Sequence, residues 1–298
     1  MKYVSLILLF ATLSLFANAS AKMSPYFKLG EFTESVEEIG NKIKSSLTEN
    51  EFEVIGEYHP ENNSNMLVIV YTNETLKSTV SGLKERAALA STLKVGIIRK
   101  NEQTSVFMLN PDYMFHAYLM EKMEKSNIAT PLKAISTKAI SALKPINKEF
   151  TAYGGGNMDN EDLWDYHYMF GMPYFTDPVT LNTFSSFEEG VKTIQNNLSK
   201  QKGVTVKVYE LIYADKKVAV FGIGLHDKTI GEAQFLPIIG EEHLAAMPYE
   251  IILEGTKASM LHGRYRFALY WPELTMGTFT KIMSTPGNVE SALEDLTK

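Results

Sequence analysis

Four residues near the C-terminal end of the sequence could bind an anion. His262, Arg264, Arg266 and Tyr270 occupy even-numbered positions of the segment 258–270, whose composition predicts a strand. Because alternate side chains of a strand point to the same face, the imidazole and the two guanidinium groups would form a row. Arginine binds carboxylate, sulfate and phosphate groups well. The row predicts a site for a small anion, or a solvated face whose arginines pair with glutamates of a neighbouring strand.

An aromatic-rich segment in the middle of the chain, residues 164–175, could bind a different kind of ligand. Its aromatic side chains include Trp164, Tyr168 and Tyr174, which we add to the candidate ligand-binding residues. The segment could line a ligand pocket, or a haem crevice with His167 or Met169 as an axial ligand. It could instead pack the two halves of the chain together, because it is too apolar for a solvated linker.

Metal binding and covalent catalysis have weaker support. His226, His243 and His262 have acidic neighbours, but their spacing fits no metalloenzyme signature such as H-E-x-x-H. The sequence has no cysteine, which excludes disulfides, thiolate nucleophiles and cysteine-ligated metal sites. No phosphate loop, dinucleotide-binding fingerprint or nucleophile elbow is present, and no residue is indicated as catalytic.

The order of predicted elements is similar in the two halves of the chain. In the first half, helical periodicity from Phe32 to Leu47 is followed by strands at 52–58 and 66–72, a helix at 74–93, strands at 94–99 and 105–109, and a helix at 112–125. In the second half, we expect a helix at 187–198, strands at 204–213 and 218–225, a helical or irregular stretch at 229–246, strands at 249–253 and 258–270, and helices at 273–283 and 288–296.

Two short sequence matches support a duplication. The segment 32–36 resembles 187–191 at an offset of 155 residues, and 107–112 resembles 267–273 at an offset of 161 between the prolines. A long period that is nearly constant across a module favours two copies of one unit. We therefore predict an α+β protein of two tandem modules, each an antiparallel sheet with helices packed on one face. The other faces of the two sheets could form a shared concave surface.

The N-terminus has the parts of a secretory signal peptide. Lys2 supplies a positive charge, residues 4–16 are mostly apolar, and Ala17-Asn18-Ala19 is a cleavage pattern, with residues 19–21 as an alternative. The apolar run of about 13 residues is shorter than the roughly 20 that a membrane-spanning helix needs, so an uncleaved anchor is the less favoured alternative. The predicted division is a signal peptide at 1–21, a first module at 22–128, a connecting helix and aromatic-rich segment at 129–185, and a second module at 186–298.

Composition and charge narrow the classes of partner. The 298 residues are 45% hydrophobic and 21% charged, as in ordinary globular proteins. The formal net charge is −6, and loss of Lys2 with the signal peptide makes it one unit more negative. A mildly acidic protein has no overall field for nucleic acid, so we expect no nucleic-acid partner. No later apolar run is long enough for a membrane span.

The modules resemble the domain-of-unknown-function 302 family. The family's strand motif, read as L-P-C-R-V-x-V, is similar to residues 247–253 of the second module and to 93–99 of the first. The terminal N/D-P of the family is similar to Asn110-Pro111 and, less closely, to Trp271-Pro272. The resemblance implies a TBP-like α+β fold and no established activity. Tyr249-Glu250 stands where the family has Cys-Arg, so chemistry that uses that cysteine is not expected.

These observations predict an exported soluble protein, periplasmic or secreted, with a binding or accessory role. Its partner would be a small anionic or aromatic ligand, or another protein. The alternative is a metal- or haem-dependent enzyme or redox accessory protein, and a third reading is a purely structural envelope protein. The sequence identifies no cofactor.

Overall fold

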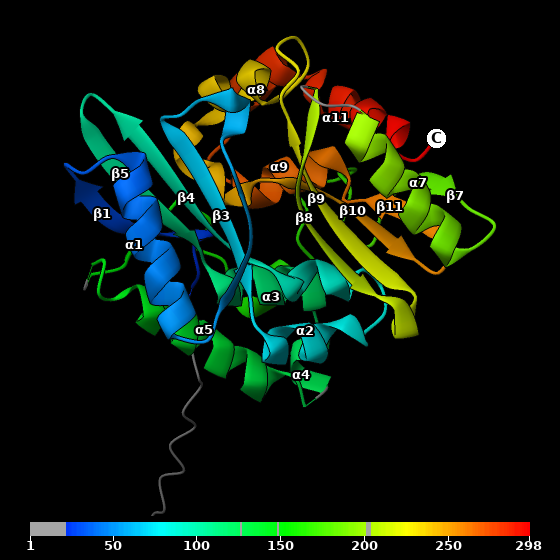
Figure 1. Cartoon of the computed structure of the whole chain (residues 1–298), viewed down its shortest axis with the longest axis horizontal. Coiled ribbons are helices and arrows are strands. Elements are labelled where there is room, and N and C mark those ends of the chain that lie inside the picture. The colour runs from blue at the N-terminus through cyan, green and yellow to red at the C-terminus, as the bar shows by residue number, and fades with distance from the viewer. Residues whose placement is uncertain (1–21, 126, 148, 201–203) are drawn as a thin grey trace, which may run out of the picture.

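The computed structural model describes residues 22–298, apart from 126, 148 and 201–203, so the predicted signal peptide lies outside the described residues. The protein is an α+β protein with two antiparallel sheets that lie side by side (Figure 1). No helix in the part of the chain that the structure describes is long and apolar enough to span a membrane.

The first module is built around a six-stranded sheet. Its elements in chain order are β1 (Tyr26–Phe32), α1 (Val36–Glu49), β2 (Glu53–Tyr58), η1 (Pro60–Asn62), β3 (Met66–Thr72), α2 (Glu74–Ser81), η2 (Ala87–Ser91), β4 (Leu93–Lys100), β5 (Gln103–Leu109) and α3 (Pro111–Leu119). The strand order is β2-β3-β4-β5-β1-β6. The short strand β6 (Thr151–Tyr153) comes from the connecting segment and pairs with β1.

The second module repeats the same plan around a five-stranded sheet. Its elements are β7 (Val179–Thr183), α7 (Phe187–Lys200), β8 (Thr205–Tyr213), η3 (Ala214–Lys216), β9 (Val218–Leu225), α8 (Glu232–Ile239), η4 (Glu241–Ala246), β10 (Tyr249–Glu254), β11 (Lys257–Met260) and α9 (Gly263–Tyr270). The strand order is β7-β11-β10-β9-β8, which matches β1-β5-β4-β3-β2 of the first sheet read from the same end. The predicted fold class is confirmed.

The remaining helices surround the two modules. They are α4 (Lys122–Lys125), α5 (Ala129–Leu143) and α6 (Asn160–Trp164) in the connecting segment, and α10 (Met276–Phe279), η5 (Thr280–Ile282) and α11 (Thr285–Asp295) at the C-terminal end. Helix α5 packs against α1, α2 and α3, so the predicted connecting helix lies against the first module. Strand β7 lies inside the segment expected to connect the modules, yet it belongs to the second sheet.

One face of each sheet is covered by a long amphipathic helix of its own module. Helix α1 lies against β2, β3 and β4, and α7 lies against β8, β10 and β11 (Figure 1). Helix α1 begins with a capping box, in which Ser35 and Glu38 each satisfy a backbone N–H of the other. The apolar stripe of α1, including Ile39 and Ile43, is fully buried against the sheet.

The other face of the first sheet is covered by the opposite module. Segment η4 of the second module contacts β3, β4 and β5, and it approaches so closely that a Cβ at Gly96 would lie 2.7 Å from Cβ of Leu244. The equivalent segment η2 of the first module contacts β9 and β10. The expectation of a shared concave surface is therefore wrong, because the modules bury these surfaces against each other.

The predicted strand 258–270 is also wrong. The strand ends at Met260, and residues 263–270 form helix α9, which is capped by the His262 side chain accepting a hydrogen bond from the Arg264 N–H. Seven of the eight residues of α9 are buried, so the helix has apolar neighbours on nearly every side. A helix that is buried all round has no amphipathic period, and its sequence can be misread as a strand.

Helix α9 is the counterpart of α3, because each follows the matching strand of its module. Asn110 caps α3 as His262 caps α9, which gives an offset of 152 residues (262 − 110). At this offset Tyr113, Phe115 and Tyr118 align with Tyr265, Phe267 and Tyr270. The alignment of Asn110-Pro111 with Trp271-Pro272 is therefore wrong, since Trp271 lies at the C-terminal end of α9.

Candidate functional site

Helix α9 separates the residues that were predicted to form an anion-binding row. Successive residues of a helix are turned by about 100°, so Arg264 and Arg266 point to nearly opposite sides. The Arg264 side chain is exposed, whereas Arg266 and Tyr270 are buried. His262 is half-buried and occupied as the helix cap. The row itself does not exist, and its members belong to different environments.

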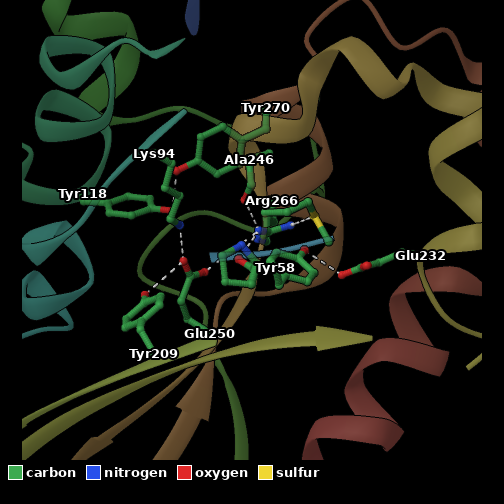
Figure 2. Close-up of polar contacts among 11 residues, drawn as sticks. Tyr58, Lys94, Tyr118, Tyr209, Glu232, Ala246, Glu250, Arg266 and Tyr270 are labelled. Atoms are coloured by element: carbon green, nitrogen blue, oxygen red, sulfur yellow. Dashed lines mark hydrogen bonds and ion pairs between the residues drawn. The ribbon is translucent and has the colours of Figure 1, made fainter. Parts of the chain in front are cut away.

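Arg266 belongs to a buried polar cluster between the modules (Figure 2). Its Nη2 donates hydrogen bonds to the carbonyl oxygens of Ala246 and Pro248, and its guanidinium lies 3.8 Å from the ring centroid of Tyr249. Burial acts to lower the pKa of Arg266, but Tyr249 and Glu250 outweigh it and the pKa stays above its ordinary value. Arg266 is thus a fully charged group held inside the protein.

An ion pair joins the two modules within this cluster. The Nζ of Lys94 on β4 contacts Oε1 of Glu250 on β10, and both side chains are almost completely buried. Glu250 also lies 4.0 Å from Arg266 Nη2, and its Oε1 accepts a hydrogen bond from Tyr209 at 3.5 Å. Burial lowers the pKa of Lys94, while the charge of Glu250 opposes this shift. Lys94 is the second residue of β4 and Glu250 is the second residue of the matching strand β10. The ion pair therefore joins equivalent positions of the two modules.

Two equivalent tyrosines meet beside the ion pair. The hydroxyl groups of Tyr118 on α3 and Tyr270 on α9 are 2.6 Å apart (Figure 2). Tyr113 extends the contact by donating to the backbone oxygen of Leu269 at 2.8 Å. Burial raises the pKa of Tyr118 and of Tyr270, so both phenols stay protonated. The cluster holds the modules together and is closed to ligands, which places Arg266 and Tyr270 in the core.

A buried carboxyl group forms a second junction between the modules. Glu232 on α8 accepts hydrogen bonds from the Tyr58 hydroxyl at 2.9 Å, from the Leu225 N–H at 3.1 Å and from the Glu61 N–H at 3.1 Å. Tyr58 and Glu61 belong to the first module, and Leu225 to the second. Burial raises the pKa of Glu232 to about 7 despite the three hydrogen bonds.

His243 on η4 occupies an aromatic cage. Its ring lies 5.1 Å from the ring of Tyr26, 5.5 Å from that of Tyr153 and 5.7 Å from that of Trp271. The glycine-rich segment 153–157 approaches it closely, since a Cβ at Gly154 would lie 3.3 Å from His243 Nε2. Neither ring nitrogen has a hydrogen-bond partner among the described protein groups. Burial lowers the pKa of His243 to about 4, so the ring is neutral at pH 7.

This environment predicts that His243→Phe raises the free energy of unfolding at pH 7 by about 1 kcal/mol. Phenylalanine keeps the aromatic contacts and removes two buried polar atoms that have no partner. Urea denaturation followed by tryptophan fluorescence gives the change, with His243→Leu as a control for lost ring contacts. A loss of more than 1 kcal/mol in His243→Phe would show that the ring nitrogens have a partner and would contradict the prediction.

A pocket lies on the exposed side of α9. It encloses about 30 Å³, enough for roughly one water molecule. Arg264 and Trp271 lie on or just after α9, and Tyr168 comes from the aromatic-rich segment. The complete lining is Tyr168, Met172, Arg264, Phe267, Ala268, Trp271, Leu274, Met276 and Phe279. Within the described residues the Arg264 guanidinium has no ion-pair partner, so it is the one charged group in an otherwise apolar or aromatic lining.

The aromatic-rich segment positions one wall of this pocket. The Trp164 indole N–H donates to Nδ1 of His116 at 3.0 Å, and the Tyr166 hydroxyl donates to the backbone oxygen of Ala268 at 2.8 Å. These contacts fix the segment against α3 and α9, after which Tyr168 reaches the pocket. Of the seven candidate ligand-binding residues, Arg264 and Tyr168 meet at this pocket, whereas Arg266 and Tyr270 meet in the buried cluster.

The other predicted features of this segment have different surroundings. The ring of Tyr174 packs against that of His167 in a tilted arrangement, with ring centroids 4.4 Å apart, and Met169 is exposed. The described residues contain no group of three or more histidine, aspartate and glutamate side chains that could hold a metal ion.

Sequence reasoning missed most of the apolar pocket residues. Phe267 lies in the segment predicted as a strand, and Leu274, Met276 and Phe279 lie in the predicted helix 273–283, and none of them was predicted to bind a ligand. The match at an offset of 152 residues between α3 and α9 could have placed Phe267 and Trp271 at this site. It predicts a helix at 263–270 and places Arg264, Ala268 and Trp271 on neighbouring turns.

The comparisons with known proteins are sparse. The structure is similar to a crystal structure of an uncharacterised conserved protein, DUF302, from Bacillus stearothermophilus, with 12% sequence identity and a TM-score of 0.33. The match covers 40% of this chain and 96% of that chain. No protein-family model matches the sequence, and no curated protein matches it. A similarity of this size carries no inference about activity, and membership of that family stays a prediction.

Proposed function

We propose that this protein binds a small ligand that has an apolar part and a carboxylate, in the pocket beside α9. The observation that carries the proposal is Arg264, a charged side chain without an ion-pair partner among the described residues, in a lining that is otherwise apolar or aromatic. Ligand sites in proteins commonly combine apolar walls with a few polar groups that fix orientation. The predicted signal peptide supports a role outside the cytoplasm, so we propose a periplasmic or secreted binding protein.

The chemistry of the lining defines the two parts of the ligand. A guanidinium binds a carboxylate through two parallel hydrogen bonds, which orients the bound group. Phe267 and Trp271 line the pocket but are almost fully buried, so accessible apolar surface is offered by the exposed Tyr168 and Met276. Met172 and Met276 have flexible side chains that can adapt to the apolar part. Because Arg264 is exposed, its contribution is smaller than that of a buried charge.

The proposal predicts that Arg264→Gln weakens the binding of 4-phenylbutyrate by roughly tenfold, which corresponds to about 1.4 kcal/mol. Binding of 4-phenylbutanol, which has the same apolar part and no charge, is expected to be unchanged. Tryptophan fluorescence in a Trp164→Phe background reports on Trp271, which lines the pocket. Lys192→Gln removes an exposed positive charge on α7 and serves as the matched control.

A variant that fills the pocket tests whether the ligand binds there or elsewhere on the protein surface. Ala268→Leu places a larger side chain in the pocket and leaves Arg264 in place, so it is expected to weaken the binding of both probes. If 4-phenylbutyrate binds equally well to wild type, Arg264→Gln and Ala268→Leu, the ligand site lies elsewhere and the proposal fails. The proposal also fails if 4-phenylbutyrate does not bind to the wild type.

A further inference from the structure

Exposed apolar side chains also occur close in sequence to the residues that line the pocket beside α9. Met169, Phe170 and Met283 flank the pocket residues in sequence and are exposed, with Phe170 fully accessible to solvent. Met276 lines the pocket and is itself 47% exposed. We call Met169, Phe170, Met276 and Met283 the apolar rim. Exposed apolar residues that gather around a pocket mark binding surfaces more often than singly scattered ones do.

Local structure connects the rim to the pocket on both sides. Met276, Phe279 and Met283 have a spacing of three and four residues in a helical stretch, so they lie along one stripe. The first two line the pocket, and Met283 extends the stripe away from it. On the opposite wall, the Met172 N–H donates to the Met169 oxygen at 3.0 Å and closes a turn. Phe170 lies within this turn, between the pocket residues Tyr168 and Met172.

The small enclosed volume limits what the pocket alone can bury. The space inside the pocket is about 30 Å³, enough to hold roughly one water molecule. Most of an apolar ligand must therefore lie outside the enclosed part, on the rim. A ligand that uses the rim is longer than the pocket and has no polar groups along its apolar part.

We infer that the ligand is an unbranched aliphatic carboxylate whose carboxylate binds Arg264 and whose chain lies across the rim. This inference rests on the proposed function and specifies its ligand class. An alkyl chain fits better than a peptide, because peptide N–H and C=O groups need partners and none of the residues that line the pocket belongs to a strand. The unbranched side chains of Met276 and Met283 can follow the shape of a linear chain.

The test measures dissociation constants for hexanoate, octanoate and decanoate by isothermal titration calorimetry. If each added CH₂ is about half buried, binding becomes about twofold tighter per CH₂, so decanoate binds about 16-fold tighter than hexanoate. The double variant Phe170→Ser/Met283→Ser is expected to reduce this ratio to about threefold or less by the same reasoning, while hexanoate binding changes by less than about twofold. Ile212→Ser removes an exposed apolar side chain from β8, away from the pocket residues, and should keep the wild-type ratio.

Each alternative result has a separate meaning. Equal affinity for hexanoate and decanoate in the wild type overturns the chain-length inference and leaves carboxylate binding at Arg264 intact. A full chain-length effect in the double variant also overturns the inference, because the chain then lies elsewhere. Sedimentation at the same protein concentration tests whether a second copy of the chain occupies the rim. If the wild type is a dimer, the double variant is a monomer and the wild type shows no chain-length effect, the inference is overturned as well. Failure of every carboxylate to bind contradicts the proposed function itself.

Discussion

Replacement of Lys94 by methionine is expected to lower the free energy of unfolding by about 3 kcal/mol, with about 5 kcal/mol as the upper end. The substitution leaves the buried carboxylate of Glu250 without its closest cation, and the remaining cation, Arg266, lies 4.0 Å away. The cost of an uncompensated buried charge is much larger than the net value of an ion pair. Urea denaturation of the full chain measures the effect.

A double-mutant cycle shows whether the loss comes from the unpaired charge. Lys94→Met/Glu250→Met removes both members of the pair but leaves the buried Arg266 guanidinium without a carboxylate, so its loss should be smaller than the sum of the losses of the two single variants. Lys133→Met is the matched control, since Lys133 forms an exposed ion pair with Asp112 at 2.6 Å and should contribute less than about 1 kcal/mol. A loss below 1 kcal/mol in Lys94→Met, or strictly additive effects in the cycle, would contradict the assigned pairing.

Glu232 should make the protein less stable as the pH rises through neutrality. Its pKa in the folded protein is about 7, against an ordinary value of 4.5, because burial disfavours the ionised form. The folded state therefore binds the proton more tightly than the unfolded state does. The resulting stability is fully present below pH 4.5 and is lost as the pH rises through 7. The expected loss between these limits is about 3 kcal/mol.

The measurement is urea denaturation at pH 5, 6.5 and 8 for the wild type and Glu232→Gln. The variant cannot ionise, so it should lack the fall of about 3 kcal/mol. Neighbouring groups contribute a background that both proteins share. Burial raises the pKa of Glu61, and burial lowers the pKa of His226, which stacks on Tyr58.

Glu188→Gln on α7 controls for removal of an exposed carboxylate. If the free energy of unfolding changes with pH in the same way for the wild type and Glu232→Gln, the Glu232 carboxyl group does not titrate between pH 5 and pH 8.

The first and last residues of two central strands could be predicted correctly from the sequence. Strands β3 (Met66–Thr72) and β9 (Val218–Leu225) are buried at every position. Their sequences are therefore continuous apolar runs between turn residues, a pattern typical of strands that are buried on both faces. Strand β1 was missed because Lys28 and Glu31 interrupt its apolar pattern and a register shift occurs between Lys28 and Gly30.

The candidate site could be predicted only in part, because its residues come together through tertiary structure. Arg264 and Tyr168 were found from residue type alone, but the sequence placed them in different sites. Leu274 and Phe279 reach the same pocket from beyond the C-terminal end of α9, which no local pattern indicates. Arg266 was chosen for the same reason as Arg264, yet the turn of the helix directs it into the core.

The placement of η4 on the first sheet has a consequence for how the chain acquires its structure during synthesis. The inner face of β4 is covered by Leu244 and Ala245, which a ribosome adds about 150 residues after Gly96. Until then the first half exposes apolar surface and the uncompensated ammonium group of Lys94. Neither half can reach its final stability alone, so the two halves should mature together once the whole chain is available. The growing chain must meanwhile be protected from aggregation.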